Sequence, residues 1–166
     1  MAQSGGGGRS VGLVAAVVVA LVLLCLGGTM VAGVVAAIAV PNFVAMQLKA
    51  KRAEVPSNVE GIKTAVLAYD AAFDEYKFCG DERSARRSAG KELHPWAEDP
   101  CWRELGWRPD GDVRGGYWIE RVVGDDGSPS FAVHGVADMD GDGVLAEYVG
   151  TETENARLVT DSANVY

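Results

Sequence analysis

The sequence has few basic residues and none of the common short catalytic motifs. Its 166 residues include 15 lysines and arginines against 23 acidic residues, a formal net charge of -8. Because a nucleic-acid-binding surface usually needs a basic patch, this balance argues against a nucleic-acid partner. The sequence contains no nucleophile elbow, P-loop, dinucleotide-binding fingerprint or HExxH motif. Without such motifs, we expect that the protein is not an enzyme. His94 has no second histidine or cysteine at metal-ligand spacing, so we expect it to be structural.

Charge is missing altogether from one long stretch. No residue from Val11 to Val40 is charged, and only Thr29 and the glycines interrupt the apolar run. About 20 apolar residues span the core of a bilayer, so this run is long enough to cross one. We therefore expect a flexible glycine-rich leader over residues 1–10, a transmembrane anchor over residues 11–40 and one soluble domain after it.

Two processed forms compete with an uncleaved anchor. A cleaved secretory signal would use Ala37-Ile38-Ala39 as its site, but its usual apolar core is only about 7–15 residues long. A lipoprotein would use Cys25, but the bulky Leu24 stands where a small residue is expected. The pattern favours an uncleaved or minimally trimmed signal anchor.

The cysteines and the basic residues give opposite indications of the compartment. With Cys25 in the apolar run, Cys79 and Cys101 form the one pair in the soluble part. A disulfide between them would indicate an oxidising compartment; two unrelated buried thiols are the alternative. Arg9 before the anchor and Lys49, Lys51 and Arg52 after it would instead place the soluble domain in the cytoplasm.

A second helical pattern follows the anchor. Pro41 is expected to bend the helix without ending it. An apolar stripe with helical spacing then marks an amphipathic segment over residues 41–76; its members are Val55, Val59, Ile62, Val66, Tyr69 and Phe73. Ser57 and Glu60 form a capping-box pattern, which predicts a helix restart there after Pro56. The charged residues of this segment are interpreted as a solvated surface; they are Lys49, Lys51, Arg52, Glu54, Glu60 and Lys63.

The remaining residues, 77–166, are predicted to form a loop region and an antiparallel sheet. Residues 78–109 show no periodicity, and their three tryptophans, Trp96, Trp102 and Trp107, are expected to close the edge of a core. Aromatic and β-branched residues predict strands over 116–123, 130–136, 144–149 and 156–160, with His134 facing outward. The predicted fold class is α+β: a long N-terminal transmembrane and amphipathic helix packed on a small antiparallel sheet.

One acidic loop has the spacing of a metal site. Asp138, Asp140 and Asp142 alternate, and Gly141 and Gly143 permit the positive φ angles that a tight curl requires. Three close carboxylates suit Ca²⁺, with the Val144 carbonyl and the Glu147 carboxylate as further ligands. The first half of this loop follows the EF-hand pattern. In its second half, Val149 stands at the position where an EF-hand has its bidentate glutamate. The alternative is a hairpin turn held by aspartate side chains bonded to the backbone.

Three sequence stretches resemble a known family. "GVVAAIAVPNF" (33–43), "KAKRAE" (49–54) and "NVEGIKTAVLAYDAAF" (58–73) resemble the N-terminal helix of type IV pilins and pseudopilins. "LGWRPDG" (105–111) before a "GYWIE" strand (116–120) is similar to pilin-like proteins with small heads. The resemblance implies a single-pass protein of the bacterial inner membrane with a periplasmic head. Its partners would be membrane lipid and other pilin or pseudopilin subunits, contacted through the N-terminal helix in a surface pilus or a type II secretion pseudopilus.

The sequence departs from that family at its processing site. Members carry a glycine before the cleavage point, then an aromatic residue, and a glutamate a few residues later. Aligned on Gly33 and Pro41, this chain has Val19 at the glycine position and Leu24 at the glutamate position, and its first acidic residue is Glu54. The alternative function is therefore a non-polymerising, membrane-anchored periplasmic module that binds calcium or another ligand.

Overall fold

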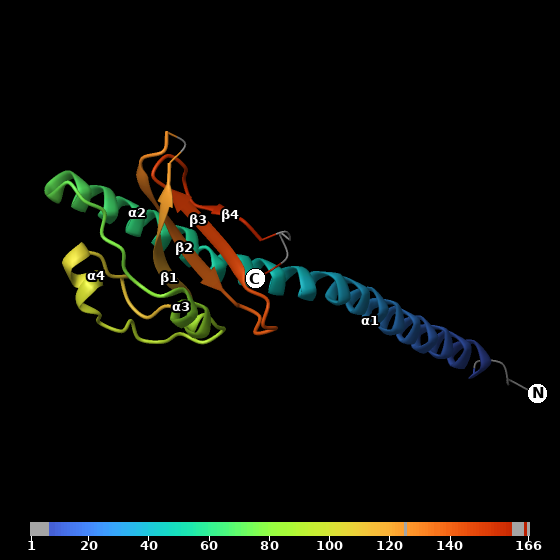
Figure 1. Ribbon diagram of the computed structural model, residues 1–166. Helices are drawn as coiled ribbons and strands as arrows, with labels where there is room; N and C mark the ends of the chain where they lie inside the picture. Colours follow the sequence, from blue (N-terminus) through green and yellow to red (C-terminus); the bar gives the residue numbers. More distant parts are fainter. Residues whose placement is uncertain (1–6, 125, 161–164, 166) are drawn as a thin grey trace, which may run out of the picture. The chain divides into compact units, whose positions relative to one another are not determined.

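The long N-terminal helix is the first element of the computed structural model, which describes residues 7–124, 126–160 and 165 (Figure 1). Helix α1 covers Gly7–Arg52. Its residues from Gly12 on belong to the one helical stretch of the described residues, Gly12–Phe73, that is long and apolar enough to cross a membrane. The predicted anchor is thus helical, and Pro41 lies inside the helix. Of the predicted flexible leader, residues 7–10 are already helical, and residues 1–6 lie outside the described part.

The chain divides into two compact units after Ala45, and each is described by itself. The first unit consists of α1 up to that residue. The second unit contains the end of α1, helix α2 (Glu54–Phe73), helices α3 and α4, and the sheet. We call the second unit the head.

The helix restarts earlier than the capping-box pattern predicted. Helix α2 begins at Glu54, and its N-cap residue Ala53 makes no side-chain capping bond. The prediction of a restart at Ser57 is therefore wrong. Pro56 explains the interruption, because it has no N–H to donate to the carbonyl group of Arg52 four residues earlier.

The head contains a four-stranded antiparallel sheet in the order β1-β2-β3-β4 (Figure 1). The strands cover Gly116–Val123, Pro129–Ala137, Ala146–Thr151 and Arg157–Leu158. The four predicted strands are confirmed; the first has the predicted ends, and the ends of the other three differ. The third begins at Ala146 and not at Val144, because the N–H of Val144 donates to the Asp142 side chain and so belongs to the preceding turn (2.7 Å).

Helix α2 packs its apolar stripe on one face of this sheet. Val55, Val59, Ile62 and Val66 are fully buried, as the spacing predicted. The helix lies very close to the middle strands: a Cβ atom on Gly135 would come within 2.6 Å of Val59 Cγ2. The stripe ends earlier than predicted, since Tyr69 is half-buried and Phe73 is 63% exposed. These two rings pack on each other, with their centroids 4.5 Å apart.

Three charged residues of α2 that were predicted to be solvated instead contact the backbone of loops next to the sheet. Lys63 is 8% exposed and donates to the Glu154 carbonyl oxygen at 2.8 Å. Glu60 accepts a hydrogen bond from the backbone N–H of Ala156, and Glu54 accepts one from that of Arg114 at 2.9 Å. These polar contacts therefore hold α2 to the loops around the sheet on both sides of its apolar stripe. The helical spacing of apolar residues in the sequence predicted the apolar stripe, but it did not predict these polar contacts.

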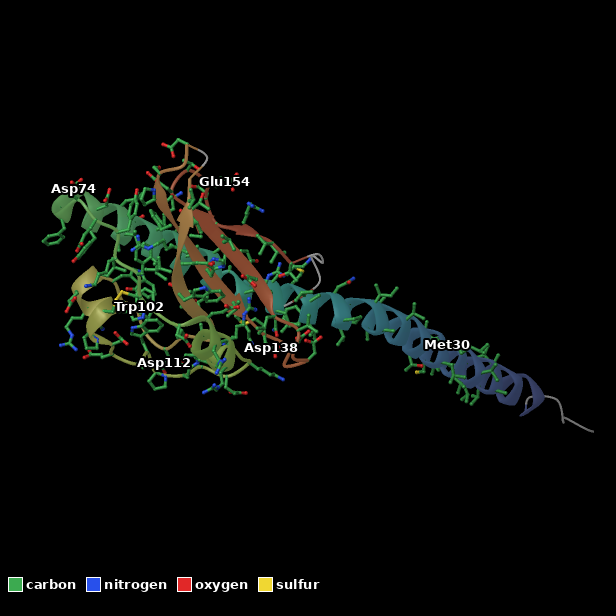
Figure 2. All side chains as sticks on the ribbon, viewed as in Figure 1. Met30, Asp74, Trp102, Asp112, Asp138 and Glu154 are labelled. Atoms are coloured by element: carbon green, nitrogen blue, oxygen red, sulfur yellow. A yellow bond between two sulfur atoms is a disulfide. The ribbon has the colours of Figure 1, made fainter. Side chains whose placement is uncertain are left out.

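The segment predicted as loop contains two short helices, α3 (Glu82–Ser88) and α4 (Pro100–Leu105). Asp81 and Asp99 cap them, each accepting a backbone N–H at its helix start. The predicted disulfide between Cys79 and Cys101 is confirmed, and it ties the chain before α3 to α4. It lies close to Trp102 (Figure 2). The three tryptophans pack against the core, as predicted.

We predict that Gly135→Ala destabilises the head by about 1–3 kcal/mol, because the added methyl group would overlap Val55 and Val59. The measurement is the free energy of unfolding of the detergent-solubilised full chain. Gly111→Ala is the matched control, because nothing lies within 4 Å of a Cβ atom at that position. Equal stability of the two variants would contradict the packing of α2 on the sheet.

Candidate functional site

The exposed surface of α1 is the largest feature that the packing of the molecule leaves unexplained. Every residue from Gly12 to Val44 whose burial is described is exposed. The large apolar side chains among them include Leu24 (72% exposed) and Met30 (77%). Monomeric soluble proteins rarely expose contiguous apolar areas of this extent, so this helix is suited to lipid or to apolar protein surfaces.

This apolar surface is longer than a bilayer core. At 1.5 Å per residue, the helix from Gly12 to Val44 is about 50 Å long. The hydrocarbon core of a bilayer is about 30 Å thick, so about 20 Å of apolar helix extends beyond it when the helix stands upright. Tilting accommodates part of such an excess.

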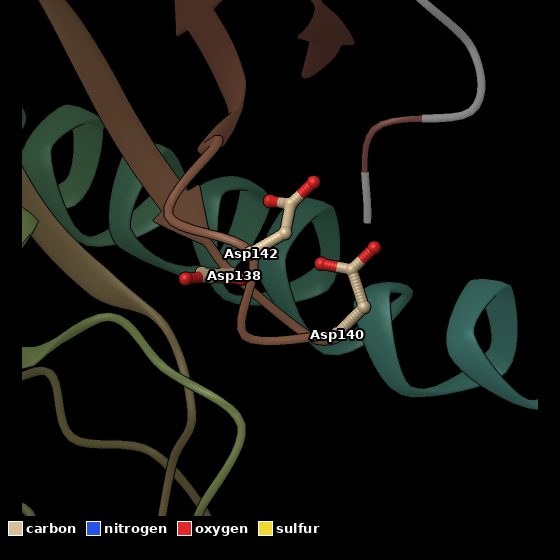
Figure 3. A group of neighbouring side chains, drawn as sticks. All are labelled: Asp138, Asp140 and Asp142. Atoms are coloured by element: carbon tan, nitrogen blue, oxygen red, sulfur yellow. The ribbon is translucent and has the colours of Figure 1, made fainter.

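The three predicted aspartate ligands lie together in the turn between β2 and β3. Asp138, Asp140 and Asp142 each offer a carboxylate oxygen within 4.8 Å of the other two (Figure 3). Gly141 and Gly143 have φ angles of 79° and 85°, the left-handed conformation that glycine adopts without strain. The loop therefore curls as predicted and brings three carboxylates to one place.

Hydrogen bonds within the turn engage two of these aspartates. Asp138 is 9% exposed and accepts the N–H groups of Gly141 (2.7 Å) and Gly143 (3.0 Å). Asp142 accepts the N–H of Val144, whereas Asp140 is exposed. These bonds are the ones expected for the alternative, a turn held by side chain–backbone contacts. They leave each carboxylate oxygen a free lone pair, so they are compatible with a cation as well.

Glu147, the fifth predicted ligand, belongs to a different cluster. Its Oε2 accepts from Arg86 Nη2 at 2.7 Å, and its Oε1 lies 3.1 Å from His134 Nδ1. Burial alone would raise the pKa of Glu147, but the hydrogen bonds from Arg86 and His134 outweigh it and hold that pKa below its usual range. The prediction that Glu147 completes the aspartate site is therefore corrected: the structure groups only the three aspartates and places the Glu147 carboxylate against Arg86 and His134.

His134 is also more enclosed than predicted. Its side chain is 14% exposed and stacks on Trp118, with the ring planes 8° apart. Its Nε2 lies 3.1 Å from Glu120 Oε2, without the alignment of a hydrogen bond. Arg86 of α3 lies over the same tryptophan ring. The strand alternation placed His134 on the correct face, but nothing in the sequence indicated that α3 would cover it.

We predict that calcium raises the melting temperature of the chelator-treated full chain in detergent, because a bound cation relieves the repulsion among the three carboxylates. Asp140→Ala should abolish that rise; it removes an exposed ligand that makes no hydrogen bond with another described residue. Asp110→Ala, which changes an exposed acid outside the loop, is the control, and its melting temperature should still rise with calcium. If millimolar calcium leaves the melting curve of the unmodified chain unchanged, the loop is only a turn.

Comparison with protein-family models, curated proteins and solved structures gave no significant match to this chain. What the protein does must therefore be inferred from its own residues.

Proposed function

We propose that the protein is a pilin-like, single-pass protein of the bacterial inner membrane. It would serve as a structural or accessory subunit of a type IV pilus or a type II secretion pseudopilus. The observation that carries the proposal is the contrast along the helical stretch from Gly7 to Phe73. From Gly12 to Val44 every residue whose burial is described is exposed, and the second part of the stretch buries a stripe of valines and an isoleucine under an antiparallel sheet. Such a chain joins a membrane or filament core to a water-exposed head.

The excess length of the apolar helix supports an assembling subunit. A protein that only needed an anchor would require about 20 apolar residues. Here the helix has no charged residue from Ser10 to Leu48. The part beyond the bilayer core would be covered by the same part of neighbouring subunits, through van der Waals contacts between close-packed helices.

The disulfide supports a periplasmic head. Bridges such as Cys79–Cys101 form and persist in oxidising compartments, of which the bacterial periplasm is one. Lys49, Lys51 and Arg52 favour the opposite orientation under the positive-inside rule. We give the disulfide more weight, because it links two segments of the folded head.

The second candidate function is a membrane-anchored periplasmic module that binds calcium or another ligand and does not polymerise. Two observations favour it. Val19 and Leu24 stand where the family carries its cleavage glycine and its glutamate. The three aspartates of the β2–β3 turn also present their oxygens within 4.8 Å of one another.

We predict that residues 1–19 are retained in the protein extracted from bacterial membranes, because the prepilin peptidase would find valine where it reads glycine. Intact-mass measurement and N-terminal sequencing test this. A triple variant that restores the family residues, Val19→Gly with Ala20→Phe and Leu24→Glu, is the comparison, and Val18→Gly is its single-residue control. A mature chain beginning at Ala20, especially a methylated one, would contradict retention and support ordinary pilin assembly.

A further inference from the structure

Two neighbouring cavities lie on the part of the head formed by α3, α4, the segment between them and the residues from the end of α4 to the start of β1. One has a volume of about 660 Å³ and the other of about 530 Å³. Small-molecule sites typically measure about 300–1,000 Å³. The two cavities share four lining residues, Pro95, Trp96, Asp99 and Trp102. The two cavities therefore adjoin along these residues, and we call them together the tryptophan-walled groove.

Tryptophans form the apolar wall of the larger cavity. The ring centroids of Trp96, Trp102 and Trp107 lie 5.3–5.6 Å from one another. Trp102 is buried, whereas Trp96 and Trp107 are half-buried and offer ring surface to a ligand. The wall is held firmly, because Trp102 follows the disulfide-bonded Cys101 and Trp107 abuts Gly61 of α2. A wall fixed before binding lowers the entropic cost of association.

Charged side chains of both signs line the same cavity. Glu98, Arg103, Arg108 and Asp112 are exposed, and none of them has a side-chain hydrogen bond or ion pair with another described residue. These four charges cancel. Asp99 adds one negative charge, but its Oδ1 caps α4. A phosphate or another strong anion is therefore disfavoured.

The chemistry of this rim indicates the class of ligand. Carboxylates only accept hydrogen bonds, and guanidinium groups only donate them. A hydroxyl group does both, so a chain of closely spaced hydroxyl groups can bridge Glu98 or Asp112 to Arg103 or Arg108. A sugar ring carries such hydroxyls on its edge and C–H groups on its faces, which can pack on the exposed indole surfaces.

We propose that this tryptophan-walled groove of the head binds a neutral oligosaccharide. This inference goes beyond the proposed function and does not depend on whether the chain polymerises. The sugar faces lie against Trp96 and Trp107, and the hydroxyl groups bond to the charged rim. Several linked sugar units extend through both cavities past Pro95 and Trp96.

The test is titration of the full chain, solubilised in a detergent without a sugar headgroup, with chitohexaose and with maltohexaose. Binding is followed by tryptophan fluorescence and by isothermal titration calorimetry. We expect a saturable response to at least one of the two. The double variant Glu98→Gln with Asp112→Asn should weaken it by tenfold or more, on the order expected when hydrogen bonds to charged groups are lost. Both positions are exposed, so the variant should fold normally, and its melting temperature verifies this.

The matched control is Glu92→Gln with Asp110→Asn, which removes two exposed acids that line neither cavity. It should bind as tightly as the unmodified chain. Three results would overturn the proposal: no saturable response to either hexasaccharide at millimolar concentration, equal weakening in the control variant, or binding of an uncharged peptide in place of the sugars.

Discussion

The packing of α2 on the sheet is the interaction on which the rest of the head depends. Four fully buried side chains, Val55, Val59, Ile62 and Val66, cover the sheet at one helical face. The close approach is possible because β2 has a glycine at position 135, beneath the two valines. Polar contacts from Glu54, Glu60 and Lys63 then fix both sides of the helix to the loops around the sheet.

The same helical stretch meets two different requirements along its length. Up to Val44 its apolar side chains are exposed, so lipid or other helices must cover them. From Val55 to Val66 its apolar stripe is buried against its own sheet. After the uncharged run, charged residues resume at Lys49, between these two regions. Under the proposed function, this change over a few residues would let the helical stretch leave a bilayer and hold a folded domain in water.

Hydrophobic periodicity predicted the elements that repeat over several turns or strands, and it missed the short ones. The α2 stripe and the four strands follow from regular spacing, and the disulfide follows from the only two cysteines outside the apolar run. Helices α3 and α4, of seven and six residues, are too short to show a period. Asp99 followed by Pro100 was a usable start signal for α4.

The candidate site was predictable only where its residues are neighbours in the chain. Asp138, Asp140 and Asp142 meet because one turn carries all three. Glu147 was assigned to them by proximity in sequence, but Arg86 from a distant helix and His134 from β2 engage it instead. The tryptophan-walled groove likewise depends on tertiary packing, with Trp107 set against Gly61 of α2. Sequence spacing does not encode such long-range contacts.

The central claim is that α1 crosses a membrane and presents the head on the oxidising side. Thiol labelling in intact bacterial spheroplasts with a membrane-impermeant maleimide tests it most directly. Cys25 in the apolar helix is the one free cysteine, and Thr153 is an exposed position of the head where Thr153→Cys adds a second. We expect Thr153→Cys to be labelled in intact spheroplasts and Cys25 to be labelled only after detergent is added. Labelling of Cys25 in intact spheroplasts, or of Thr153→Cys only after lysis, would contradict this account.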